Sequence, residues 1–169
     1  LPTRSSSDLG FERLSNITKV PRFVKKEELQ YAGVDAAWFI PDGYGKSKTI
    51  LYLHGGGYVV GSYNTHRALI ARIARASGCK ALAINYRKAP ENAYPCALID
   101  ALAAYKKMLE DGYENIFIMG DSAGGGLTLA LLQMIRKQRL QKAAGVVLLS
   151  PWTDLTLSGD SIRSKKDKD

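Results

Sequence analysis

The sequence is poor in cysteine and histidine, with two of each among 169 residues. Two cysteines cannot form the dense disulfide framework of a small secreted domain, so we expect Cys79 and Cys96 to be free thiols. No stretch reaches the ~18 apolar residues of a membrane span. Residues 1–8 also lack the basic and apolar regions of a signal peptide. These absences favour a cytoplasmic protein with no membrane span.

Charge of one sign is not concentrated in any segment. Lys and Arg number 24 against 16 Asp and Glu, a net charge of +8. The basic residues are dispersed, and the densest group, residues 163–168, is interrupted by Asp167. No zinc-finger, RNA-recognition or helix-turn-helix signature accompanies the charge. We therefore expect a solvated basic surface and no nucleic-acid partner.

The rest of the composition is that of one globular domain, with 46% hydrophobic and 24% charged residues. Apolar runs predict strands at 29–31, 34–40, 49–53, 81–85, 116–119 and 145–149, and periodic segments predict helices at 8–16, 66–76, 97–109 and 122–137. This alternation predicts an α/β fold, a doubly wound, mostly parallel sheet with helices on both faces. Ligands bind such sheets at the carboxyl ends of the strands.

A glycine loop follows the predicted strand 49–53, with the sequence His54-Gly55-Gly56-Gly57-Tyr58. Three glycines in a row expose backbone N–H groups with no Cβ in the way, so the loop can point donors at a developing oxyanion. A flexible or phosphate-cradling loop is the alternative. A Walker motif is excluded because no Gly-Lys-Ser/Thr follows.

A second glycine-rich turn, residues 120–125, follows the predicted strand 116–119 and contains Gly-x-Ser-x-Gly. At a strand-to-helix junction this pattern is the nucleophile elbow, which would expose the hydroxyl of Ser122 at a helix N-terminus. The backbone N–H of Ala123 is the natural partner donor for an oxyanion. The alternative is that Ser122 is a plain helix N-cap.

Two further loops follow the remaining strands. Pro90 and Pro95 make residues 86–95 a defined, non-helical connection between the predicted strand 81–85 and the predicted helix 97–109. After the last strand, Trp152 and Asp154 suit a pocket wall. Equally, Trp152 could be packed in the core and Asp154 could cap the next turn.

These four loops, in this order, resemble the hormone-sensitive-lipase-like branch of the α/β-hydrolases. The matching segments are His54–Gly57, Tyr86–Pro95, Gly120–Gly125 and Ser150–Asp154, and the resemblance runs over about residues 30–163. Most members of the branch are bacterial carboxylesterases, and they need no metal or organic cofactor.

The resemblance implies a role for each matching residue. Ser122 would be the acylated nucleophile, and the N–H groups of Gly56, Gly57 and Ala123 would form the oxyanion hole. Gly55 would allow the turn, and His54 would hold the glycine loop rather than act as base. Asp121 would support the local network, and Tyr58 and Trp152 would line the substrate pocket. Residues 1–28 would form an N-terminal cap segment. Residues 29–169 would be the N-terminal part of the catalytic domain.

The sequence departs from the family after the nucleophile. The triad order in this fold is Ser, then Asp or Glu, then His, and no histidine follows Ser122. His66 lies before it, and we expect it on the surface or behind the site. Family members are roughly twice as long. We therefore expect the last strands, the triad Asp and the triad His in a C-terminal portion outside this sequence. This chain alone would be inactive or nearly so.

The function that the resemblance implies is hydrolysis of short- to medium-chain carboxylic esters through an acyl-enzyme on Ser122. The partner would be a small-molecule ester. One alternative is a small-molecule binding protein, because plant gibberellin receptors resemble the same family and keep its fold. A fragment without activity is the other alternative. The residue at the triad His position, which this sequence does not contain, discriminates between an enzyme and a receptor.

Overall fold

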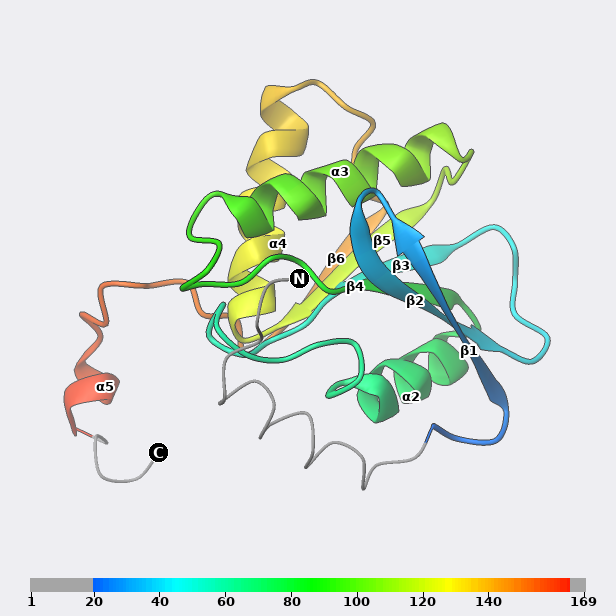
Figure 1. Cartoon of the computed structure of the whole chain (residues 1–169), viewed down its shortest axis with the longest axis horizontal. Helices are drawn as coiled ribbons and strands as arrows, with labels where there is room; N and C mark the ends of the chain where they lie inside the picture. The colour runs from blue at the N-terminus through cyan, green and yellow to red at the C-terminus, as the bar shows by residue number, and fades with distance from the viewer. Residues whose placement is uncertain (1–19, 165–169) are drawn as a thin grey trace.

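The computed structural model describes residues 20–164, which form one mixed sheet flanked by helices (Figure 1). The elements are β1 (Val24–Tyr31), β2 (Val34–Pro41), β3 (Thr49–Leu53), α2 (Arg67–Ser77), β4 (Lys80–Ile84), α3 (Cys96–Glu110), β5 (Ile116–Asp121), α4 (Ala123–Lys137), β6 (Gly145–Leu149) and α5 (Asp160–Ser164). The helix expected at 8–16 lies outside the described residues, as does most of the expected cap segment.

The sheet order is β1-β2-β4-β3-β5-β6. β1, β2 and β4 pair antiparallel, whereas β4, β3, β5 and β6 pair parallel. This arrangement confirms the predicted doubly wound, mostly parallel sheet.

The first strand is longer than the sequence pattern indicates. β1 begins at Val24, which pairs with Pro41, and the ladder continues to Tyr31 opposite Val34. Its middle residues are mostly charged and solvent-exposed because β1 is an edge strand, so apolar runs do not reveal its start. The strand therefore extends across residues 28 and 29, where we expected the cap segment to end and the catalytic domain to begin.

Each face of the sheet carries its own hydrophobic core. Side chains alternate along β3, so Leu51 and Leu53 pack with α3 and α4, while Ile50 and Tyr52 pack with α2. α2 ends as predicted at Gly78, whose backbone is left-handed with φ of 63°. Among residues 20–164, no helix has the length and apolar content needed to cross a membrane.

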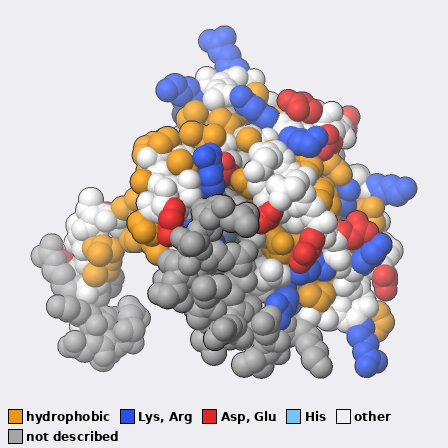
Figure 2. Space-filling view, in the orientation of Figure 1, with side chains coloured by type: hydrophobic (Ala, Val, Ile, Leu, Met, Phe, Trp, Pro, Cys, Tyr) orange, Lys and Arg blue, Asp and Glu red, His pale blue; other side chains and the backbone are white. Residues whose placement is uncertain are grey.

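The charge distribution and the state of the cysteines agree with the sequence analysis. Figure 2 shows Lys and Arg side chains scattered over one face and mixed with Asp and Glu, rather than gathered in a stripe. Both cysteines are free thiols, with Cys79 buried and Cys96 half-buried.

Candidate active site

Ser122 stands on a sharp turn between β5 and α4. Its φ of 50° and ψ of −119° are a strained combination for a residue with a side chain. Its N–H donates to the Leu149 carbonyl at 2.9 Å and its carbonyl accepts from the Trp152 N–H at 2.8 Å, so the end of β6 and the segment after it anchor the turn. The side chain makes no capping hydrogen bond to α4 and the residue is exposed, unlike a plain N-cap.

Close packing explains the small residues after Ser122. A Cβ on Gly124 would overlap the carbonyl of Leu53, the last residue of β3. The first turn of α4 therefore lies directly against the end of β3, where the glycine loop begins. This contact brings the elbow and the glycine loop together.

The glycine loop is a tight turn with left-handed backbone at three successive residues. The φ angles are 123° at Gly56, 62° at Gly57 and 63° at Tyr58. The Gly56 carbonyl accepts from the N–H groups of Val59 and Val60 at 3.0 and 2.9 Å. A Cβ on Gly56 would overlap the Val60 carbonyl, so this position requires glycine.

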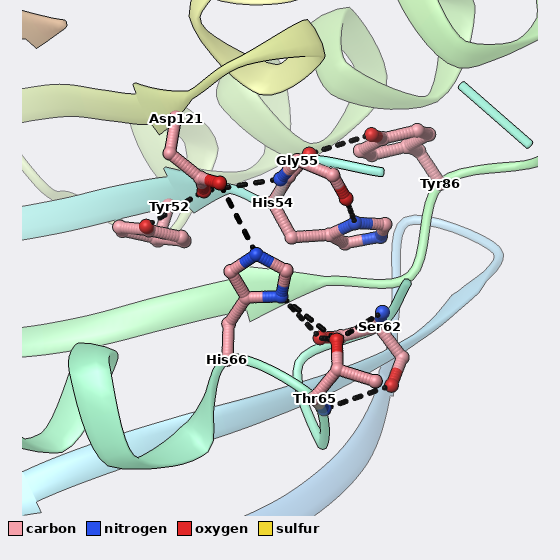
Figure 3. A network of polar contacts seen from close by, with 8 residues as sticks. All are labelled: Tyr52, His54, Gly55, Ser62, Thr65, His66, Tyr86 and Asp121. Atoms are coloured by element: carbon pink, nitrogen blue, oxygen red, sulfur yellow. Dashed lines mark hydrogen bonds and ion pairs between the residues drawn. The ribbon is translucent and has the colours of Figure 1, made fainter. Parts of the chain in front are cut away.

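Asp121 connects the loop to the elbow (Figure 3). Its Oδ1 accepts from the Gly55 N–H at 3.0 Å and from the Tyr52 hydroxyl at 2.8 Å, and its Oδ2 accepts from His66 Nε2 at 3.2 Å. Burial opposes ionisation of this carboxyl. The three hydrogen bonds and the nearby His66 outweigh it and hold the pKa of Asp121 below its usual range.

His54 is a buried anchor of the same loop. Its Nδ1 donates to the Gly55 carbonyl at 2.7 Å, its ring stacks on Tyr86 with centroids 4.3 Å apart, and its carbonyl accepts from the Tyr86 hydroxyl at 2.6 Å. Burial lowers the pKa of His54 to about 3. A base this weak is poorly matched to general-base catalysis near neutral pH.

His66 lies behind the site rather than on the surface, the two positions that we considered for it. It precedes α2, and its side chain, 15% exposed, reaches the Asp121 carboxylate. The contact joins residues 55 positions apart. No local sequence pattern indicates it.

A cavity of about 410 Å³ lies beside the elbow between α3, α4 and the segment after β6. Tyr58 and Trp152 both line it, with ring centroids 6.2 Å apart. The lining includes the apolar side chains of Pro95, Leu98, Leu127 and Leu155 and the polar side chains of Arg87, Asn92 and Gln133. The cavity is therefore largely apolar, with aromatic rings on the side of the glycine loop.

Asp154 caps the turn that follows it, which is the second of the two roles considered for this residue. Its carboxylate accepts from the N–H and hydroxyl groups of both Thr156 and Ser158. These hydrogen bonds hold the pKa of Asp154 well below its usual range. Asp154 is thus committed to its own turn, and it does not line the cavity.

A serine on a strained strand-to-helix turn, beside a glycine loop at the carboxyl ends of parallel strands, defines the α/β-hydrolase class. This chain belongs to that family: the family model described as alpha/beta hydrolase fold matches residues 50–169.

Named relatives are ester-cleaving enzymes. An acetyl-hydrolase of Streptomyces hygroscopicus is 38% identical over 170 residues, which cover 98% of this chain and 54% of the relative. The carboxylic ester hydrolase LipN of Mycobacterium tuberculosis is 34% identical over 134 residues, covering 73% of this chain and 36% of LipN. The chain thus spans about half the length of the first relative and about a third of LipN.

Solved structures confirm the resemblance to the hormone-sensitive-lipase-like branch. An esterase from the bacterial hormone-sensitive lipase family superposes with a TM-score of 0.92 at 38% identity, covering 100% of this chain and 58% of that one. The esterase EstE5, in a crystal soaked with p-nitrophenyl butyrate, gives a TM-score of 0.90 at 40% identity, covering 99% and 58%.

Proposed function

We propose that this chain carries the nucleophile and the oxyanion hole of a serine carboxylesterase. The observation that carries the proposal is the strained backbone of Ser122 at the start of α4, directly beside a glycine loop. In the proposed reaction a general base takes the proton of Ser122 Oγ as it attacks the ester carbonyl, and it gives this proton to the departing alcohol. The same base then activates water, which hydrolyses the acyl-enzyme and releases the acid.

The proposed oxyanion hole consists of the backbone N–H groups of Gly56, Gly57 and Ala123. Gly56 and Gly57 lie in the tight turn, and Ala123 is the first residue of α4. Each such donor stabilises the tetrahedral intermediate, and losing one typically costs ~3–4 kcal/mol. The anchoring of the loop by Asp121 and His54 supports this role, because an oxyanion hole has to be preorganised before the reaction.

Neither histidine of this sequence is suited to be the general base. His54 is buried with a pKa of about 3. In His66, Nε2 faces Asp121 and Nδ1 faces Thr65 Oγ1 and the Ser62 carbonyl, so both ring nitrogens have partners other than Ser122. We therefore propose that the triad His and its Asp partner come from a C-terminal portion of the same protein. The greater length of the relatives supports this proposal.

The proposed substrates are short- to medium-chain carboxylic esters, with the acyl or alcohol group beside Tyr58 and Trp152. The size and apolar lining of the cavity support this class. The names of the relatives point the same way, since they include an acetyl-hydrolase and an esterase studied with p-nitrophenyl butyrate.

We also propose a cytoplasmic location, since two free thiols favour a reducing compartment.

The experiment uses the whole protein that contains this chain and p-nitrophenyl butyrate. We expect release of p-nitrophenol and a mass increase of one butyryl group on Ser122 in a rapidly quenched sample. Ser122→Ala should lose both signals, while Ser47→Ala, at an exposed loop serine, should keep them. Full turnover by Ser122→Ala would refute the assignment. A protein that binds small esters in the cavity without cleaving any would instead support the receptor-like alternative.

A further inference from the structure

The strongest feature outside the proposed catalytic groups is the imidazole of His66, which supports Asp121 from behind (Figure 3). The two carboxylate oxygens of Asp121 have different partners. Oδ1 accepts from Gly55 and Tyr52, whereas Oδ2 accepts from His66 Nε2 at 3.2 Å. Because both oxygens belong to one rigid group, holding Oδ2 also fixes the direction of Oδ1.

The His66 ring is itself held in place. Its Nδ1 lies 2.8 Å from Thr65 Oγ1 and 3.2 Å from the Ser62 carbonyl. Ser62 Oγ accepts from the N–H groups of Asn64 and Thr65, so this turn is rigid before α2 begins. The turn thus aims Nε2 at Asp121 rather than at solvent.

Two aromatic rings border the imidazole. The ring of Tyr52 lies 6.4 Å from it and the ring of His54 lies 5.6 Å from it, centroid to centroid. His66 therefore contacts each group that shapes the start of the glycine loop: the strand β3, the loop histidine and the carboxylate that accepts from Gly55.

We propose that His66 is a positioning residue for the oxyanion hole. It acts through Asp121 on the Gly55 N–H, and so on the backbone directions of Gly56 and Gly57. The proposal rests on the proposed function, since it assigns His66 a part in the same site. His66 neither touches substrate nor exchanges a proton with it.

This role predicts a specific kinetic signature. An oxyanion exists in the transition state and not in the bound ester, so a displaced N–H group lowers kcat and leaves KM almost unchanged. A small displacement of a catalytic group typically costs up to about 100-fold. We expect loss of the His66 donor to lower kcat by about 10- to 100-fold.

The test compares His66→Gln with His66→Asn in the whole protein. Both substitutions introduce an amide, but the longer Gln can place its N–H₂ where His66 Nε2 lies and Asn cannot. We expect Gln to keep most of kcat and Asn to lose it, with KM within about twofold in both. Affinity for a trifluoromethyl ketone, whose adduct with Ser122 carries an oxyanion, should fall in parallel with kcat.

A double-mutant cycle with Asp121→Asn checks the route of the effect. If His66 acts through Asp121, adding His66→Asn to Asp121→Asn should lower kcat no further. Equal kcat and equal ketone affinity in the Gln and Asn variants would overturn the proposal, as would fully additive losses. A wild-type protein without any esterase activity would instead refute the proposed function, so the two failures are distinguishable.

Discussion

The Asp121 carboxylate accepts a hydrogen bond from the Gly55 N–H at 3.0 Å, which joins the residue before the nucleophile to the first glycine of the glycine loop. The same carboxylate also binds Tyr52 and His66. The position of the loop relative to Ser122 thus depends on one partly buried anion.

Replacing that anion should destabilise the protein at neutral pH. Asp121→Asn puts an N–H₂ group against one of the donors that now point at the carboxylate, which leaves a buried polar group unsatisfied. The expected loss is about 1–3 kcal/mol of unfolding free energy. Urea denaturation measures it, with Asp42→Asn as a control because Asp42 is exposed in a turn. An equal, near-zero effect of both substitutions would contradict the anchoring role.

The same residue predicts an acid-dependent loss of stability. Folding lowers the pKa of Asp121, so its stabilising contribution is complete above the unfolded value near 3.8 and disappears as the pH falls through the folded value. Between about pH 5 and pH 2, the unfolding free energy of Asp121→Asn should fall less steeply than that of the wild type. Parallel curves would show that Asp121 titrates alike in both states.

The hydroxyl of Tyr86 supports the loop from the opposite side. It donates to the His54 carbonyl at 2.6 Å in a buried setting. Tyr86→Phe leaves that carbonyl without this partner and should cost about 1–3 kcal/mol in urea denaturation. Tyr94→Phe is the matched control, because Tyr94 is 86% exposed, and should change stability by less than ~0.5 kcal/mol.

Much of this architecture could be predicted from the sequence because its signals are local. The strands β3 and β6 have the predicted bounds, and Gly78 ends α2 as expected. The Gly-x-Ser-x-Gly motif identified Ser122, which has a strained backbone, because the sequence also predicts the strand before the motif and the helix after it. The start of β1 was missed, since an edge strand tolerates charged residues on its exposed side.

The supporting network could not be predicted in the same way. The contact between His66 and Asp121 joins the residue before α2 to the last residue of β5, an approach that residue spacing does not encode. The same holds for Tyr86 and His54, which pair only because two loops converge at one sheet end. The role of Asp154 also needed coordinates, because its residue type suited a pocket wall and a turn cap equally.

The turn at Gly56 should be the least tolerant position of the glycine loop. Its φ of 123° and the overlap of a Cβ with the Val60 carbonyl predict that Gly56→Ala costs about 3 kcal/mol or more. Gly43→Ala is the control, because Gly43 has a φ of 67° but open space around it. That substitution should cost about 1–2 kcal/mol, the ordinary cost of left-handed backbone. Thermal or urea unfolding separates the two, and equal losses would show that the overlap relaxes.

The outer strand β6 should make the 169-residue chain self-associate when it is produced alone. β6 ends the sheet, and Val146, Val147 and Leu149 are 37%, 40% and 36% exposed. An exposed apolar edge offers unpaired backbone groups to a second chain. Sedimentation velocity should therefore show concentration-dependent association that Val147→Lys reduces. Leu69→Lys, at a position 39% exposed on α2, should not reduce it. A monomeric wild-type chain with a cooperative melt would contradict the expectation that β6 needs further strands beside it.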